Sequence, residues 1–133
     1  MISATIGFIG GGNMAASIIG GLLASGVPGS HIRVGEPNAE SRQKLQALGD
    51  IQVTADNDSV VSQSDIIVLA VKPQVMRNVL ASLAEPLRQH RPLLISIAAG
   101  VTTGAMNDWL GDSLAIVRCM PNTPALLQSG ATG

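Results

Sequence analysis

The sequence predicts an α/β fold in which a mainly parallel sheet is covered by helices on both faces. Short apolar runs alternate along the chain with longer segments of helical character. Runs such as Ile66–Val71 are apolar at successive rather than alternate positions, which is typical of strands buried on both faces of a parallel sheet. With 133 residues, of which 46% are hydrophobic and 2% aromatic, the chain has the length and the aliphatic balance of one such domain.

This alternation predicts each element in turn. The expected strands are Ala4–Ile9, Ile32–Val34, Ile51–Val53, Ile66–Val71, Leu93–Ile97 and Leu114–Val117. The expected helices are Asn13–Ala24, Ala39–Leu48, a short segment for which Asp56, Asn57 and Asp58 are the candidate N-caps, a segment from Pro73 toward Leu83, and Thr102–Leu110. Gly26 and Pro28 end the first helix, and Pro73 has the fixed φ that favours a first helical turn.

The composition of the chain narrows the class of partner. The formal net charge is -1, so the chain lacks the basic field that attracts nucleic acid or an anionic membrane, and a small molecule is the expected partner. Cys119 is the only cysteine, which excludes an intramolecular disulfide and favours a cytoplasmic setting. No apolar run reaches the roughly 18 residues of a membrane span, and the N-terminus lacks the pattern of a signal peptide.

A glycine-rich turn, Gly10–Ala15, joins the first expected strand to the first expected helix. In this context Gly10 permits a tight turn, Gly12 lets the backbone approach a pyrophosphate, and Ala15 lets the helix pack closely on the strand. The free N–H groups of the helix are placed to bind the phosphates. The turn therefore predicts a Rossmann-type, doubly wound domain that binds a dinucleotide. The alternative is a turn that serves only the strand-to-helix geometry.

Glu36 lies just after the second expected strand, near the position where Rossmann domains carry an acidic residue that binds the adenosine ribose. A carboxylate there favours NAD, because it repels the extra phosphate of NADP. Asn38, Ser41 and Arg42 offer hydrogen-bond donors for that phosphate, which favours NADP. The residues thus indicate both cofactors, and the alternative is that Glu36 and Arg42 are ordinary solvated charges.

Four segments together resemble pyrroline-5-carboxylate reductase. They are Gly7–Ala15 (GFIGGGNMA), Ala70–Pro73 (AVKP), Ser96–Val101 (SIAAGV) and Arg118–Ala125 (RCMPNTPA). The resemblance implies an N-terminal Rossmann domain that binds NAD(P)H, followed by an all-helical domain that forms the dimer and part of the substrate pocket. Residues 1–125 would form the first domain, and residues 126–133 would begin the second, which is otherwise absent from this chain. Because this family often uses NADP, NADP is narrowly favoured over NAD.

The quoted motifs fall at the carboxyl ends of expected strands, where ligands bind in open parallel sheets. The resemblance and this placement give the expected cofactor-binding residues Gly10, Gly11, Gly12, Asn13, Met14, Glu36, Asn38, Asn57, Ala70, Val71, Lys72, Pro73, Ala98 and Ala99. Asn122 and Thr123, between two prolines, are expected near the nicotinamide and the substrate. The alternatives are a helix N-cap for Asn57, a solvated position for Lys72 and an interdomain hinge around Asn122. No catalytic side chain and no metal site is expected.

The resemblance implies hydride transfer from NAD(P)H to the C=N carbon of 1-pyrroline-5-carboxylate, which gives L-proline in the last step of proline biosynthesis. The cofactor supplies most of this chemistry, so the protein chiefly aligns the two rings. A β-hydroxyacid dehydrogenase, whose opening segment is similar, and a non-enzymatic NAD(H)-sensing module are the alternatives. Without the helical domain we expect a poorly active fragment, and we expect the homo-oligomer to form through that missing domain.

Overall fold

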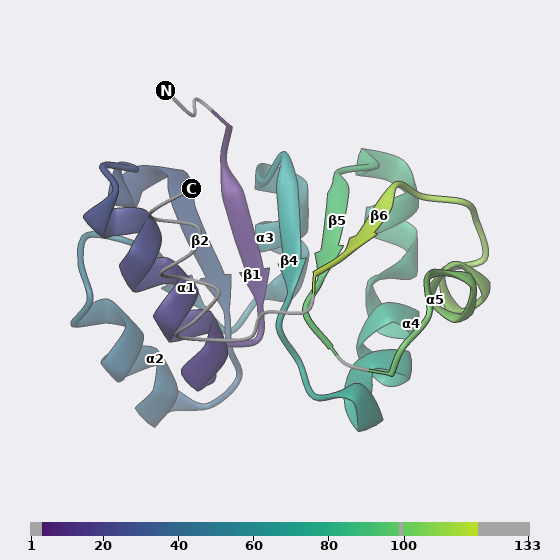
Figure 1. Cartoon of the computed structure of the whole chain (residues 1–133), viewed down its shortest axis with the longest axis horizontal. Coiled ribbons are helices and arrows are strands. Elements are labelled where there is room, and N and C mark those ends of the chain that lie inside the picture. Colours follow the sequence, from purple (N-terminus) through teal and green to yellow (C-terminus); the bar gives the residue numbers. More distant parts are fainter. Residues whose placement is uncertain (1–3, 99, 120–133) are drawn as a thin grey trace.

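The computed structural model describes residues 4–98 and 100–119, and within them a parallel sheet has the strand order β3-β2-β1-β4-β5-β6. The strands are β1 (Ile6–Ile9), β2 (Ile32–Gly35), β3 (Gln52–Thr54), β4 (Ile66–Leu69), β5 (Leu93–Ser96) and β6 (Ile116–Arg118). The helices are α1 (Asn13–Ala24), the 3-10 turn η1 (Gly29–His31), α2 (Ala39–Gln46), α3 (Asn57–Gln63), α4 (Pro73–His90) and α5 (Thr103–Leu110). This alternation, seen in Figure 1, confirms the predicted doubly wound α/β fold.

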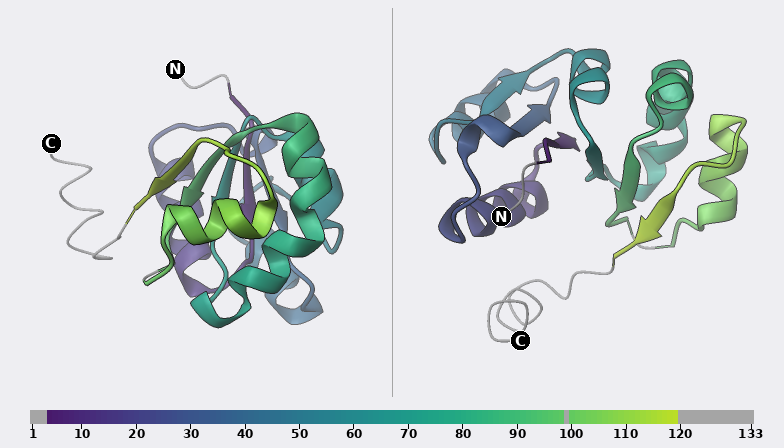
Figure 2. Two further views of the ribbon diagram at one scale, coloured as in Figure 1. Left: turned by 90° about the vertical axis from the view of Figure 1, so that its right-hand side faces the viewer. Right: turned by 90° about the horizontal axis from the view of Figure 1, so that it is seen from above.

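Helices cover both faces of the sheet, and each face has its own apolar core. On one face Ile19 of α1 and Leu45 of α2 pack with Phe8 of β1. On the other face α3, α4 and α5 pack together, and Leu80 of α4 and Met106 of α5 are fully buried among them. Figure 2 shows the strands between these two groups of helices. Burial on both faces explains why the strand sequences are apolar at successive positions.

The strand order reverses at the centre of the sheet. β1 pairs with β2 on one side and with β4 on the other, with Ile9 beside Gly35 and Leu69 in the two registers. The chain then runs outward in both directions, so the loops that leave β1 and β4 diverge. Ligands of open α/β sheets bind outside the carboxyl ends of the strands at such a switch point. These ends point to the lower edge of the view in Figure 1.

Several strands begin or end at other residues than expected. At these ends, tertiary contacts take the place of the hydrogen bonds between neighbouring strands. β6 begins at Ile116 rather than Leu114, since the buried Leu114 packs with the α5 cluster and its N–H donates to Asn107 Oδ1 at 3.0 Å. The strand expected over Ile66–Val71 ends at Leu69, where the chain turns toward Pro73. The expected strands that began at Ala4 and Ile51 begin at Ile6 and Gln52. Those expected to end at Val34 and Ile97 end at Gly35 and Ser96.

The helix that begins at Pro73 is much longer than expected and continues through Pro86 to His90. Pro86 removes one backbone hydrogen bond from the helix interior, which by itself favours a break. The side chains of Leu80, Leu83 and Leu87 recur on one stripe and are all buried, so packing holds the helix past the proline. The expectation of a helix ending near Leu83 is wrong for this reason.

The other helices follow the expected positions closely. α1 has the predicted bounds, and α2 ends at Gln46 rather than Leu48. Of the candidate caps of α3, Asp56 holds the position, and its Oδ1 accepts from the N–H groups of Asp58 and Ser59. Thr102 caps α5 rather than belonging to it, and its Oγ1 accepts from the N–H of Ala105. Across the described ranges, no helix has the length and apolar character needed to cross a membrane.

Candidate functional site

A cleft of about 430 Å³ lies at the switch point, beyond the carboxyl ends of β1, β2 and β4. Its lining consists of Ile9, Gly10, Gly11, Gly12, Gly35, Glu36, Pro37, Asn57, Ala70, Val71, Lys72, Val75 and Val79. Three strand ends and the starts of α1, α3 and α4 therefore meet there. A volume in this range is typical of sites for cofactors and small molecules.

Gly10 is required for the shape of the turn that forms the floor of the cleft. Its φ is +98°, which L side chains rarely adopt, and its N–H donates to the carbonyl oxygen of Gly35 at 2.9 Å. A Cβ at Gly10 would lie 2.7 Å from the carbonyl oxygen of Ala70. The turn from β1 is thus pressed between the ends of β2 and β4, and only glycine fits.

Gly12 differs from its neighbours because its missing side chain leaves open space. A Cβ at Gly12 would meet no protein atom within 4 Å, whereas one at Gly11 would lie 2.5 Å from Leu45 Cδ1. Gly11 is therefore explained by packing against α2. Gly12 is not, and its bare backbone lies at the cleft, as expected for a backbone that a pyrophosphate approaches.

The N-terminus of α1 has no side-chain cap. Gly12 occupies the N-cap position, and the first turn contains no acidic residue. In contrast, α2, α3 and α5 are capped by the side chains of Asn38, Asp56 and Thr102. The first N–H groups of α1 thus keep the unpaired donors and the partial positive charge of a helix start, which together bind anions.

Glu36 is held against the glycine turn by two backbone donors. Its Oε1 accepts from the N–H of Gly11 at 2.7 Å, and its Oε2 accepts from the N–H of Asn38 at 2.9 Å. The guanidinium of Arg42 donates to the carbonyl oxygens of Glu36 at 2.9 Å and Pro37 at 2.8 Å. The carboxylate is therefore fixed in place at the cleft rather than free in solvent.

Asn57 is the first residue of α3, and the cap alternative is wrong because Asp56 holds the cap position. The side chain of Asn57 lines the cleft, and its Oδ1 is buried with no hydrogen-bond partner among the described residues. A Cβ at Gly35 would lie 1.9 Å from that oxygen, so glycine at the end of β2 makes room for it. An unpaired buried amide beside a cleft is a group that a ligand can satisfy.

The far wall of the cleft is the start of α4. Lys72 has extended backbone at the N-cap position without a side-chain cap, and Pro73 follows at the first helical position. Val75 and Val79 lie one turn apart on α4 and complete this wall, and Val75 is 40% exposed. This wall places the Lys72 cation beside the apolar side chains of Val75 and Val79. Such a surface suits a ligand with a flat ring next to a charged group.

Eight of the residues expected from the sequence line this cleft: Gly10, Gly11, Gly12, Glu36, Asn57, Ala70, Val71 and Lys72. Asn13, Met14 and Pro73 lie beside the lining at helix starts and do not form part of it. Asn38 caps α2, where its Oδ1 accepts from the N–H of Ser41 at 2.9 Å. Ala98 is buried beyond β5 and does not line the cleft. Ala99, Asn122 and Thr123 lie outside the described residues.

Sequence reasoning missed Ile9, Gly35, Pro37, Val75 and Val79. Gly35 immediately precedes the acidic residue at the end of β2, and a glycine at a strand end is a signal of close approach that could have identified it. Val75 and Val79 have the i, i+4 spacing of one helix face, but this spacing does not tell whether that face contacts the core or the cleft. The answer depends on the position of α4 at the switch point.

The residues present fit a dinucleotide. The open space at Gly12 and the uncapped α1 match a pyrophosphate, and the orphaned Asn57 amide and the polar end of β2 match a ribose. Across the part of the chain that the structure describes, no group of three or more His, Cys, Asp or Glu side chains could hold a metal ion.

Comparison with known proteins agrees with this geometry. Residues 5–100 match the family model described as "NADP oxidoreductase coenzyme F420-dependent". The pyrroline-5-carboxylate reductase of Pseudomonas aeruginosa is 49% identical over 133 residues, which is 100% of this chain and 48% of that protein. The reductase of Glycine max is 42% identical over 98% of this chain and 47% of that protein. The chain thus spans about half the length of the curated relatives it matches.

Solved structures give the same result. A pyrroline-5-carboxylate reductase from Coxiella burnetii superposes with a TM-score of 0.88 at 38% identity, over 96% of this chain and 47% of that one. The Plasmodium falciparum enzyme with NADP bound has a TM-score of 0.79 at 28% identity, over 96% of this chain and 45% of that one. A 3-hydroxyisobutyrate dehydrogenase from Mycobacterium tuberculosis has a TM-score of 0.69 at 19% identity, over 88% of this chain and 39% of that one. At that identity it shares the fold alone.

The switch-point cleft, the glycine turn and the uncapped α1 are the features of a Rossmann-type domain for a nicotinamide cofactor. The chain belongs to the NADP oxidoreductase, coenzyme F420-dependent family. Within that family its similarity is to pyrroline-5-carboxylate reductases, which confirms the resemblance predicted from the sequence.

Proposed function

We propose that this chain is the cofactor-binding half of an enzyme that reduces 1-pyrroline-5-carboxylate to L-proline with NAD(P)H, the last step of proline biosynthesis. The observation that carries the proposal is the cleft at the switch point, which is lined by two of the four motifs through which the chain resembles these reductases, Gly7–Ala15 and Ala70–Pro73. When bound, the nicotinamide cofactor would supply the hydride that, together with a proton on the ring nitrogen, reduces the C=N bond of the imine to the amine of proline.

The residues of the chain bind and orient rather than react. The N–H groups at the start of α1 hold the pyrophosphate at Gly12, and Asn57 and the end of β2 hold the adenosine ribose. Val75 and Val79 provide an apolar wall, and Lys72 places a cation where cofactor oxygens come within reach. Alignment of two reactants in this way contributes several kcal/mol to a two-substrate reaction.

The remaining expectations about the whole protein belong to the same proposal. We propose that residues 1–125 form the cofactor domain, that residues 126–133 begin a helical domain, and that this second domain forms a homo-oligomer and captures the imino-acid substrate. Support comes from the relatives, which are about twice as long as this chain. Ala99, Asn122 and Thr123 are proposed to lie near the nicotinamide. A cytoplasmic location is proposed from the single cysteine.

Turnover tests the proposed reaction. A chain extended to the length of the relatives should oxidise NAD(P)H when 1-pyrroline-5-carboxylate is added. The 133-residue chain should bind the cofactor but turn over at least about 100-fold more slowly, because half of the substrate site is missing. A parallel assay offers the extended chain NAD(P)+ and a short β-hydroxyacid. Turnover of the hydroxyacid alone would identify the dehydrogenase alternative, and cofactor binding without either reaction would identify the sensor.

We propose NADH as the preferred cofactor, on the contacts of Glu36. Its carboxylate is fixed at the end of β2 by the N–H groups of Gly11 and Asn38, at the place where a ribose hydroxyl is bound and a 2′-phosphate is repelled. The donors that favour NADPH are partly used within the loop. Arg42 Nη1 donates to two carbonyl oxygens, and the backbone N–H groups of Asn38 and Ser41 donate to Glu36 Oε2 and Asn38 Oδ1.

Replacing Glu36 by serine should reverse this preference. Calorimetric titration of Glu36→Ser should show NADPH binding strengthened relative to NADH by about tenfold or more, because a repelling charge near the 2′-phosphate is removed. Glu40→Ser, at an exposed position of α2, is the matched control and should leave the ratio unchanged. A wild-type preference for NADPH, as narrowly favoured from the sequence, or a ratio unmoved by Glu36→Ser, would contradict the proposal.

A further inference from the structure

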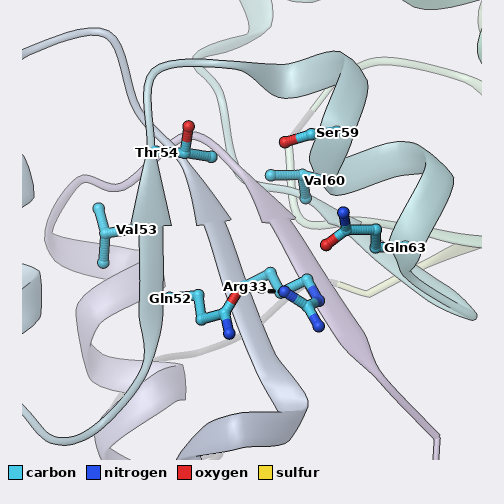
Figure 3. A pocket seen from close by; sticks show the side chains of 7 residues that line it. All are labelled: Arg33, Gln52, Val53, Thr54, Ser59, Val60 and Gln63. Carbon is cyan, nitrogen blue, oxygen red and sulfur yellow. Dashed lines mark hydrogen bonds between the residues drawn. The ribbon is translucent and has the colours of Figure 1, made fainter.

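A second pocket, unrelated to the cleft described above, lies at the β3 edge of the sheet. It has a volume of about 200 Å³ and is lined by Arg33, Gln52, Val53, Thr54, Ser59, Val60 and Gln63. Arg33 and Gln52 are register partners on β2 and β3. Figure 3 shows their side chains on the strands, with Ser59, Val60 and Gln63 facing them from α3. The volume is below the range of drug-sized ligands, so only a small molecule fits.

The lining is polar and carries one uncompensated positive charge. Arg33 donates from Nη1 to Gln52 Oε1, while its Nε is buried with no hydrogen-bond partner among the described residues. No acidic residue lines the pocket, and within residues 4–98 and 100–119 the ion pair found is that of Arg91 with Asp112. Asp58 is the neighbour of Ser59 in the sequence and Asp56 lies two residues from Thr54, but neither lines the pocket, and Asp56 Oδ1 accepts from two N–H groups in the first turn of α3.

The free edge of the guanidinium, Nε with Nη2, is the edge that binds two oxygens of an anion side by side. Other lining residues also carry donors. Gln52 and Gln63 each have an amide group, and Thr54 Oγ1 accepts from the N–H of Asp56, which leaves its own O–H free to donate. Nε is covered in the present arrangement, so binding requires the Arg33 side chain to turn toward the pocket.

We propose that this pocket binds a tetrahedral oxyanion, either inorganic phosphate or the phosphoryl group of a small metabolite. The lining offers a guanidinium, two amides and a hydroxyl, which together can donate to the several oxygens of a tetrahedral anion, whereas a carboxylate presents only two oxygens. The anion also satisfies the orphaned Nε and balances the charge of Arg33, two functions for which the described residues provide no group.

The test is a titration of backbone amide signals by nuclear magnetic resonance with inorganic phosphate, at constant ionic strength set with chloride because exposed charges are screened by salt. The Gly12→Val variant is used throughout, so that phosphate binding at the glycine turn is suppressed. Saturable shifts are expected at Gln52, Ser59 and Gln63. A parallel titration with acetate should give shifts that need at least about tenfold more ligand.

Variants decide which residue binds the anion. Arg33→Gln should weaken phosphate binding about tenfold or more, while Arg77→Gln, an exposed arginine of α4, should leave it unchanged. If Arg33→Gln does not fold, Gln63→Leu takes its place, because it keeps the arginine and fills the pocket with an apolar group. Unaltered affinity in either pocket variant, equal binding of acetate, or shifts confined to Gly10 and Gly11 would each overturn the proposal.

Discussion

Replacement of Gly12 by valine should abolish dinucleotide binding while leaving the domain folded. A Cβ at this position meets no protein atom within 4 Å, and the backbone is extended at φ -78°, so the folded chain accepts a side chain. The same side chain occupies the space between the start of α1 and a bound pyrophosphate. Calorimetry should show affinity for NADH and NADPH lowered by at least about 100-fold. The free energy of unfolding should change by no more than about 1 kcal/mol.

Gly104→Val provides the matched control. Gly104 also has open space at its Cβ position, but it lies in the first turn of α5, away from the cleft. This variant should bind both cofactors as the wild type does, with a similar free energy of unfolding. Wild-type affinity in Gly12→Val would show that the pyrophosphate lies elsewhere, and the assignment of the cleft would then be wrong.

Replacement of Gly10 by alanine should lower the free energy of unfolding by about 2–4 kcal/mol. It should also weaken cofactor binding. Two effects add at this residue. Its φ of +98° strains any L side chain, and its Cβ would lie 2.7 Å from the carbonyl oxygen of Ala70, a backbone atom that cannot rotate away. Relief requires the ends of β1 and β4 to separate. Denaturant unfolding gives the loss in stability, provided that the m-value is unchanged.

Gly26→Ala separates the two effects. Gly26 has a φ of +100°, close to that of Gly10, but nothing lies within 4 Å of its Cβ position. The Gly26→Ala variant should therefore be destabilised only by the strained backbone, by about 1–2 kcal/mol of unfolding free energy, and should keep full cofactor affinity. Equal losses in the two variants would mean that close packing of Gly10 between β2 and β4 contributes nothing.

The sequence was sufficient where local chemistry alone decides the structure. α1 has its predicted bounds because a glycine turn begins it and Gly26 follows its end. Gly10–Gly12, Glu36 and the segment Ala70–Lys72 line the cleft, since each follows a strand directly and the ends of parallel strands share one edge of the sheet. Motifs adjacent to strands are therefore placed by the topology without knowledge of the packing.

The remaining differences depend on contacts between distant segments. Pro86 favours a helix end locally, yet burial of Leu83 and Leu87 on either side of it carries α4 on to His90. Asn38 has a side chain suited to a ligand, but the nearby N–H of Ser41 takes its oxygen as a cap for α2. Val75 has the sequence pattern of an ordinary helical valine, and it lines the cleft only because of where the start of α4 lies. No property of these residues taken singly predicts such outcomes.

The uncapped start of α1 also links folding to the supply of cofactor. Its first N–H groups lack the partner that Asn38, Asp56 and Thr102 provide to other helices. At the proposed site a bound pyrophosphate would complete this hydrogen bonding in the native state. A ligand that binds only the native state adds about 2.7 kcal/mol to the free energy of unfolding at one hundred times its dissociation constant. We therefore expect resistance to heat and proteolysis to rise and fall with the dinucleotide concentration, and the domain to be least durable when the coenzyme is scarce.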